Sequence, residues 1–524
     1  MKKSQRDTQS QGRKRSSTRR QFIGAVAGSA LVGSSGLQRL FADSYGGRGH
    51  FVPDDLINYR DEIEPYVRLL EDTPREDCFG TFVQQMNSGM SYRQLMSTLF
   101  LAGIRNIDSA QVGGNLHTVF VVHSAHQLGL DSSIDQRLLP MFWAIDYFKR
   151  VQEGGRQIKP MKPFASELPE LSRPFDELEQ GCIEFDSERI ERAMVTLVRT
   201  RGAAEVAEPL WRLAARDFIP LGHKAIYMAN AWRTLQTIGW QYAEPTLRSL
   251  GSSLASYHGS GIFSMENQCY NSNLELARAH SDRLPMNWAG ERSDPAFVRK
   301  LVPLIRTGDH QAAATLVVDE LVSGAIEAQS VWDAVHLAAG EIILRVSNIG
   351  SMHGITASNA VHYAFTQASG TETRLLLLLQ GVGFVCHFIP FLKEREQTRG
   401  TPFPERDLLA IEPVEIAAGE TEATEAILDV VSTEPHAAAS QALSFASRFN
   451  DHRGFLRAAR RLVYAKGDEA HRYKFAAAVM EDLPLVSNNW KPHMLAASTQ
   501  YFCGATLPDS PVMERAREAL NDLR

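Results

Sequence analysis

The chain has 524 residues, of which 44% are hydrophobic and 22% charged, and its formal net charge is −6. This composition excludes a wholly disordered chain, a collagen-like chain and a polytopic membrane protein. The five cysteines lie far apart without any C-x-x-C pair, which disfavours a disulfide framework, a zinc ribbon and an iron–sulfur cluster.

Charge is distributed unevenly along the chain. Residues 1–42 contain nine Lys and Arg and one acidic residue, whereas residues 43–524 contain 46 basic and 60 acidic residues. The main body is therefore acidic. An acidic surface repels the phosphates of nucleic acids, so we expect no nucleic-acid partner.

The segment 1–42 is predicted to be an export signal. A basic stretch precedes the apolar run 22–37, which is rich in Gly and Ser and too short for a good membrane span. Arg19 and Arg20 precede this run and are separated from it by Gln21, as in a twin-arginine translocation (Tat) signal. We therefore expect the Tat export machinery as a partner and a periplasmic location. The signal is either cleaved after Ala42 or retained as a membrane anchor.

The rest of the chain, residues 50–524, is predicted to be one all-α domain. Apolar residues recur at i, i+3, i+4 and i+7, and alternating β patterns are scarce. The pattern favours a large helical bundle or a repeat-like array. The clearest predicted helices are 187–200, 204–216, 224–238, 295–307, 311–323, 331–346 and 374–385.

Caps and connections follow from polar and proline positions. Ser187 and Asp294 are expected to cap two helices, and Pro295 occupies a first helical position, where proline is tolerated. Prolines between residues 160 and 174 predict an irregular connection. A second connection is expected over residues 393–420.

A weak internal repeat is the most informative feature of the sequence. His117, His223, His353 and His471 each begin a predicted helix whose next two turns carry small residues. Small residues let helices approach closely. A histidine in the first turn of each of four such helices would then point into a shared centre, so we predict a metal site there.

The predicted ligands are all imidazoles, which suit iron, copper and zinc. Four histidines leave one or two coordination positions open for dioxygen or a substrate. Lys474 shares a helix face with His471. This side chain is a proton donor, a neutral buried amine, or, if carboxylated, an oxygen ligand, and the sequence does not choose among these roles.

The remaining candidates have weaker support. We expect His123 and His126 at most to contact the metal ligands without binding the metal themselves. We interpret three further histidines as structural or pocket residues. Each histidine also has the plain alternative of a hydrogen-bonded core residue. The other histidines so interpreted are His336, His362 and His493, and the candidate pocket aromatics are Tyr227, Trp232, Trp332 and Tyr473.

Other chemistries lack their motifs in this sequence. Dinucleotide and P-loop glycine motifs, haem attachment, nucleophile-elbow and zinc-protease motifs are all absent. Rieske cluster spacing is also absent, so an electron donor would have to be another protein.

The histidine segments resemble the questin oxidase-like family over about residues 55–505. The similar stretches are Asn115 to Gly129, Ile219 to His223, Met352 to Thr356 and His471 to Lys474. In the family the corresponding segments are a histidine-bearing helix, P-L-x-H, M/L-H-x-x-T and H-x-x-K. The family often has further histidines where this chain has Phe120 and Val121.

The resemblance implies an all-helical non-haem iron oxygenase that opens an aromatic or quinone-like ring or inserts oxygen into it. His117, His223, His353 and His471 would bind iron, with Lys474 at the metal, and dioxygen and a small aromatic molecule would be the substrates. Two alternatives stay open. One is an exported helical-repeat binding protein without catalysis, and the other is a zinc-dependent hydrolase.

Overall fold

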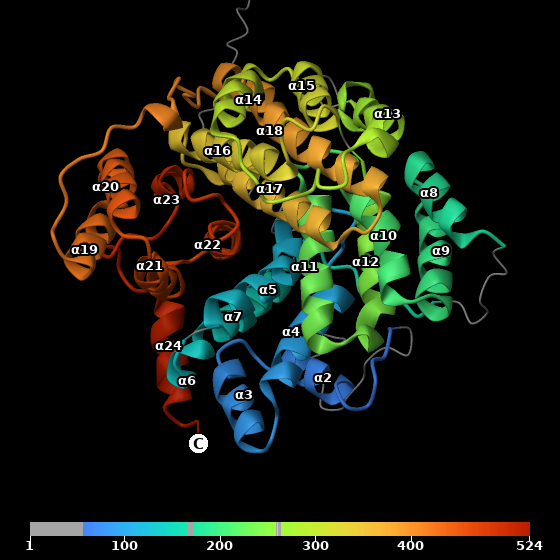
Figure 1. The fold of residues 1–524 in the computed structure, drawn as a ribbon. Helices are drawn as coiled ribbons and strands as arrows, with labels where there is room; N and C mark the ends of the chain where they lie inside the picture. Colours follow the sequence, from blue (N-terminus) through green and yellow to red (C-terminus); the bar gives the residue numbers. More distant parts are fainter. Residues whose placement is uncertain (1–55, 131, 165–171, 258, 260–263, 524) are drawn as a thin grey trace, which may run out of the picture.

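The computed structural model describes residues 56–523 except 131, 165–171, 258 and 260–263 (Figure 1). Every regular element in these ranges is a helix, which confirms the all-α prediction. The predicted export signal at 1–42 lies outside the described residues.

The first half of the described chain runs from α2 to α13. The bounds are α2 (Glu64–Asp72), α3 (Cys78–Asn87), α4 (Tyr92–Asn106), α5 (His117–Gly129), α6 (Ile134–Arg137), α7 (Leu139–Gly154), α8 (Pro174–Glu184), α9 (Ser187–Thr200), α10 (Ala203–Ala214), α11 (His223–Ile238), α12 (Ala243–Leu254) and α13 (Tyr270–His280). The proline-rich connection between α7 and α8 is irregular in its described part, as predicted.

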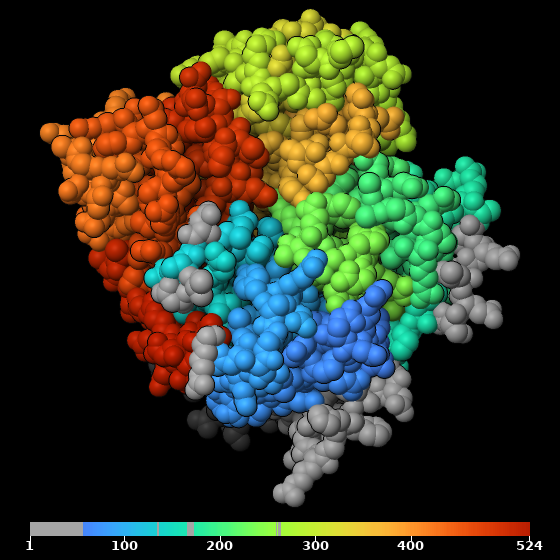
Figure 2. All heavy atoms as spheres, turned by 60° about the horizontal axis from the view of Figure 1, so that its bottom comes forward, coloured from blue at the N-terminus to red at the C-terminus, as the bar shows by residue number. Residues whose placement is uncertain are grey.

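The second half runs from α14 to the C-terminal helix. The bounds are α14 (Pro295–Thr307), α15 (His310–Val322), α16 (Ala328–Arg345), α17 (Ile349–Gln367), α18 (Thr371–Arg399), α19 (Glu420–Val430), α20 (Pro435–Arg448), α21 (Arg453–Lys466), α22 (Ala470–Asp482), α23 (Lys491–Ser498) and α24 (Pro511–Leu520). Helix α24 packs against α3 and α7, so the two ends of the described chain lie side by side (Figure 2).

Two sequence predictions are wrong in detail. Asp186, rather than Ser187, caps α9, because its side chain accepts a hydrogen bond from the Arg189 amide. Helix α18 continues to Arg399, so the polar connection begins at residue 400 instead of 393. The cap at Asp294 is confirmed, since its carboxylate accepts hydrogen bonds from two amides of the first turn of α14.

Helix α18 is long and apolar enough to cross a membrane. In the structure, 89% of its most apolar window is buried inside the protein. Its leucine-rich stretch, Leu375–Leu379, is fully buried in the main hydrophobic core. This burial is what a central core helix of an all-α protein shows.

Four helices form a closed ring around the middle of the molecule. Helix α5 packs against α11, α11 against α17, α17 against α22, and α22 returns to α5 (Figure 1). These are the four helices that carry the predicted ligands. Because each packs against two others of the set, side chains at their N-terminal ends can meet at one point.

Candidate metal centre

The ring of helices brings all four predicted histidines to its interior. His117 and His223 are the first residues of α5 and α11, and His471 is the second residue of α22. His353 is the fifth residue of α17, one turn later than expected, because Asn348 caps that helix. The prediction that every histidine lies in a first turn is therefore wrong for His353.

The chain reaches the start of α11 through a conformation that needs glycine. Gly222 has φ +76°, and a Cβ atom on it would lie 2.7 Å from the Cβ of Ala357 on α17. The absence of a side chain thus permits α11 to begin directly against α17. This close approach places His223 beside His353.

The imidazole rings converge within contact distance. His223 Nε2 lies 3.3 Å from His117 Nε2 and 3.1 Å from His353 Nε2. The His471 ring centroid is 4.5 Å from that of His117 and 5.3 Å from that of His353. One ring nitrogen from each of His117, His353 and His471 lies within 4.8 Å of the other two. The four rings therefore surround one small volume.

Backbone carbonyls hold three of the rings in one tautomer. In His117, His223 and His353, Nδ1 lies 2.5 Å from a carbonyl oxygen, which can only accept, so Nδ1 carries the proton. Their Nε2 atoms then present lone pairs to one another at 3.1–3.3 Å. Facing lone pairs need a cation or a proton between them. The three carbonyls belong to Gly114, Pro220 and Ile349.

The electrostatic surroundings keep these rings neutral. Burial, reinforced by nearby positive charge, holds the pKa of His117, His223 and His353 well below its ordinary range. Burial also lowers the pKa of His471, although Glu469, 3.6 Å from His471 Nδ1, opposes this shift. Neutral imidazole is the form that ligates metals.

Lys474 lies beside the histidines without a hydrogen-bond partner. Its side chain is 3% exposed, and Nζ is 5.6 Å from the centroid of the Phe120 ring. Burial lowers the pKa of Lys474 to about 7. A buried amine with this pKa exchanges a proton near neutral pH, and as a neutral amine it is itself a nucleophile or a ligand.

A small cavity adjoins Lys474 on the inner side of the ring. Its volume is about 20 Å³, which is room for about one water-sized molecule. His123 Nδ1 and Thr356 Oγ1 belong to residues that line this cavity, and both atoms are buried without a hydrogen-bond partner. The cavity therefore offers polar groups to a molecule no larger than water or dioxygen.

A larger pocket borders the outer side of the centre. It has a volume of about 380 Å³, and its lining includes Gly114 and Pro220, whose carbonyls orient His117 and His223. Val112 and other apolar groups complete one wall.

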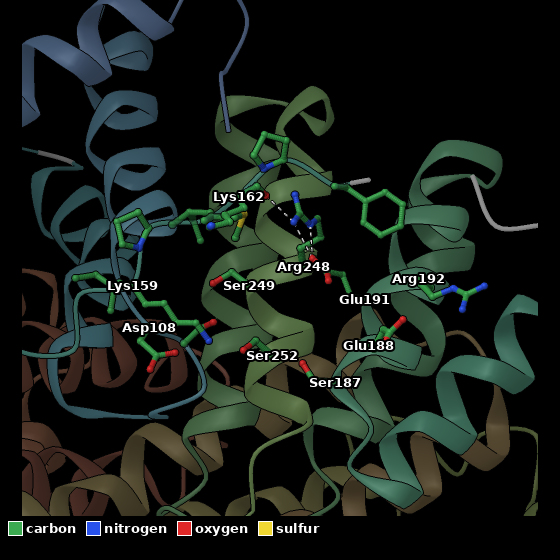
Figure 3. Close-up of a pocket in the computed structure, with 17 residues that line it drawn as sticks. Asp108, Lys159, Lys162, Ser187, Glu188, Glu191, Arg192, Arg248, Ser249 and Ser252 are labelled. Atoms are coloured by element: carbon green, nitrogen blue, oxygen red, sulfur yellow. Dashed lines mark hydrogen bonds and ion pairs between the residues drawn. The ribbon is translucent and has the colours of Figure 1, made fainter. Parts of the chain in front are cut away.

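A further pocket, drawn in Figure 3, is linked to the centre through the packed rings of Tyr227 and Phe120. It measures about 1160 Å³, and Arg248 crosses it to pair with Glu191 at 2.7 Å. Ser249 on its wall accepts a hydrogen bond from Tyr227 at 2.7 Å. The Tyr227 ring packs against Phe120, which packs against the rings of two of the histidines.

The other predicted residues divide between the centre and elsewhere. Tyr227 lies next to the centre through Phe120, and His126 bonds Tyr92 instead. Trp232 packs in a separate tryptophan cluster, and Tyr473 stacks on Trp143 with ring centroids 4.1 Å apart. His493 packs beside Trp490.

Sequence reasoning missed a second buried group. His336 and His362, interpreted as structural or pocket histidines, meet Asp482, which the sequence did not single out. Trp332 stacks on His362 rather than facing the four-histidine centre. The spacings of these residues follow no metal-binding motif, so only the packing of α16, α17 and α22 reveals the group.

The internal repeat stays a prediction. Helices α5, α11, α17 and α22 have 13, 16, 19 and 13 residues, and the histidine occupies different positions in them. Convergence of the four histidines does not require that the segments be copies of one unit.

No family model, no curated protein and no solved structure matches the chain. The resemblance to the questin oxidase-like family therefore rests on the four histidine segments alone.

Proposed function

We propose that the protein is a non-haem iron oxygenase that acts on a small aromatic or quinone-like substrate. The observation that carries the proposal is the grouping of His117, His353 and His471 together with His223, which contacts two of them. Carbonyl oxygens fix the protons of three of the four rings on Nδ1. Such a set is preorganised for a cation and unfavourable without one.

These four histidines would hold the metal ion. Iron bound there would supply the capacity to bind and activate dioxygen. The ring of helices excludes bulk water, since all four rings are buried or nearly so. The polar cavity beside Lys474 gives a small molecule a place inside the ring of helices.

Lys474 is proposed to move a proton at this cavity. Its pKa of about 7 lets Nζ hold a proton or release it at neutral pH, and no hydrogen bond ties Nζ elsewhere. Carboxylation of the same neutral amine, which would add an oxygen ligand, is the other role that its position supports.

The substrate is proposed to enter through the 380 Å³ pocket. This volume falls within the range of small-molecule sites, whereas the 20 Å³ cavity is too small for an aromatic ring. Val112, Ile219 and Pro220 offer an apolar wall for a flat ring. The loop that contains Gly114 would have to shift for the ring to touch the metal.

The donor set favours iron and oxygen chemistry over zinc hydrolysis. Within the described residues, the ligand atoms grouped at this centre are imidazole nitrogens without a carboxylate. Hydrolytic zinc sites use a positioned carboxylate as general base. Glu469 reaches the outer Nδ1 side of His471, where it orients the ring.

The test is metal content and oxygen uptake of the full chain. We expect iron in the wild-type protein and oxygen consumption with quinones or phenols when a reductant is supplied. His353→Ala should lose one equivalent of iron and the activity. His126→Ala is the matched control, because His126 lies on the ligand helix α5 but bonds Tyr92.

Three outcomes would contradict the proposal. Zinc in place of iron, with turnover that needs no oxygen, would indicate a hydrolase. A folded wild-type protein without metal would indicate a binding protein. Equal iron in wild type and folded His353→Ala would move the iron away from this centre.

A further inference from the structure

A second cluster of metal-ligating side chains lies toward the C-terminal ends of two ring helices, α17 and α22, and beside α16. His336 comes from α16, His362 from α17 and Asp482 from α22, and their exposed fractions are 1%, 5% and 1%. One ligand atom from each lies within 4.8 Å of the other two. Side chains this polar are rarely buried together unless they serve one another or a bound ion.

The distances from the two histidines to Asp482 fit a shared ion better than direct hydrogen bonds to the carboxylate. His336 Nδ1 is 3.7 Å from Asp482 Oδ2, and His362 Nδ1 is 4.0 Å from Asp482 Oδ1. Hydrogen bonds of this kind measure about 2.7–3.2 Å. Two atoms that ligate one metal ion at about 2.0–2.2 Å lie roughly 3–4 Å apart.

Unpartnered atoms point to the same conclusion. His336 Nδ1 and Asp482 Oδ2 are both buried, and neither has a hydrogen-bond partner. The direct hydrogen bond in the group joins His336 Nε2 and His362 Nδ1 at 3.0 Å, and it leaves the carboxylate out. The guanidinium of Arg233 donates hydrogen bonds to Asn359 and Glu481 rather than to Asp482. A buried carboxylate without a positive partner is costly, and a divalent cation removes that cost.

Neighbouring side chains hold Asp482 and His362 in place, as is common for metal ligands. Asn359 donates a hydrogen bond to Asp482 Oδ1 at 3.0 Å and so fixes the carboxylate. Trp332 stacks on His362, with ring centroids 4.3 Å apart, and fixes that ring. Partners of this kind orient ligands in protein metal sites.

An access route exists for an ion. A surface pocket of about 590 Å³ is lined by His362, Trp332, Phe365 and Arg374. The buried cluster therefore touches solvent-accessible space through His362. Three protein ligands with an open side are typical of sites that keep a position for water or a substrate.

We propose that His336, His362 and Asp482 form a second metal site for a divalent transition-metal ion such as Fe²⁺ or Zn²⁺. Two histidines and one carboxylate are a donor set that both ions accept. His353 and His362 are nine residues apart on α17, so the two sites lie on the order of 13 Å apart along that helix. That separation far exceeds the roughly 4 Å of a dinuclear centre, so the sites are independent.

The test measures metal content of the full chain by mass spectrometry for wild type and isosteric variants. We expect two metal ions per wild-type chain and one in Asp482→Asn, which keeps the side-chain volume but loses the charge. Asp333→Asn is the matched control, because Asp333 is a fully buried carboxylate on α16 outside the cluster. It should keep both ions. His353→Ala should lose only the ion of the first centre. The two variants therefore test the two proposed sites independently of each other.

Equal metal content in wild type and folded Asp482→Asn would overturn the second site. If Asp482→Asn does not fold, anomalous diffraction from wild-type crystals soaked in Zn²⁺ decides the matter. A peak between His336, His362 and Asp482 supports the site, and ordered side chains without a peak refute it.

Discussion

At the scale of single residues, the centre depends on how neutral side chains are held in a dry interior. The carbonyl oxygens behind His117, His223 and His353 fix their tautomers, and Glu469 approaches Nδ1 of His471. The ligand atoms therefore need no rearrangement when a cation arrives, and the groups behind them should control the affinity for metal.

Replacing Glu469 tests this control. The Glu469 carboxylate lies 3.6 Å from His471 Nδ1 and accepts a hydrogen bond from Tyr501 at 2.8 Å. Because a carboxylate behind an imidazole raises its basicity, Glu469→Gln should weaken metal affinity by about 10–100-fold. Competition with a chromophoric chelator measures the change. An affinity equal to that of wild type would show that Glu469 does not support the ligand.

Lys474 predicts a specific pH dependence of stability. Burial lowers its pKa from 10.5 to about 7, so between pH 7 and 10.5 the unfolded chain holds a proton that the folded chain has lost. The free energy of unfolding should therefore rise with pH across this range. Lys474→Met should flatten the rise and, at pH 7, raise the free energy of unfolding of the metal-free protein by roughly 2–4 kcal/mol.

Urea unfolding of metal-free wild type and variant at several pH values provides the measurement. Lys149→Met is the comparison variant. Lys149 is also buried and its pKa is also lowered, but its Nζ donates hydrogen bonds to the Leu70 and Glu71 carbonyls and to Gln152 Oε1. This variant should keep the part of the rise that Lys474 causes. If the free energy of unfolding of the wild-type protein fell from pH 7 to pH 9, the lowered pKa of Lys474 would be contradicted.

At the scale of elements, the position at which helix α11 begins determines where His223 lies in the metal centre. Gly222→Ala would place a Cβ atom 2.7 Å from the Cβ of Ala357 at a φ of +76°. The start of α11 would have to move, and His223 would move with it. We expect a loss of about 1–3 kcal/mol in the free energy of unfolding, together with weaker metal binding.

A double variant separates the two causes. Ala357→Gly removes the clash but leaves the unfavourable backbone angle, so Gly222→Ala with Ala357→Gly should recover part of the stability and most of the metal affinity. Chemical unfolding and metal titration of the single and double variants measure both quantities. No recovery in the double variant would show that the contact with α17 is irrelevant.

The periodicity of apolar residues was sufficient to locate most helices but not their ends. The predicted helices 187–200 and 295–307 match α9 and α14, because each has one apolar face and clear boundary residues. Helix α18 extends past its predicted end at residue 385, since Pro390 interrupts the helical pattern and the last two turns are polar. Caps depend on local backbone geometry, which the sequence does not specify. The predicted cap of α9, Ser187, is therefore one residue past the observed cap, Asp186.

The candidate site was predictable only where histidines recur in similar segments. His117, His223, His353 and His471 share such segments, and the structure brings them together. Asp482 shares no segment with His336 or His362. It meets them because α17 packs against both α16 and α22, and no pattern along the chain encodes that arrangement.

At the scale of the whole molecule, the four ligands are spread over residues 117–471 of the chain. A metal ion at the centre would link α5, α11, α17 and α22, which are the ring at the middle of the fold. An ion that binds only the folded state stabilises it by mass action. Removal of metal with a chelator should lower the melting temperature by several degrees.

Differential scanning calorimetry with and without chelator measures this shift, and restored metal should reverse it. His353→Ala should show a smaller shift than wild type, because it has lost the ion that joins the ring. A wild-type melting temperature that is indifferent to chelator would indicate that the ring folds without a metal link.

The central claim is that the four histidines hold iron. Anomalous diffraction at the iron absorption edge, on crystals of the full chain purified without added metal, tests it most directly. We predict a strong peak among the Nε2 atoms of His117, His223 and His353 and next to the His471 ring. Ordered imidazoles with no peak among them, or a peak that appears at the zinc edge instead, would contradict the claim.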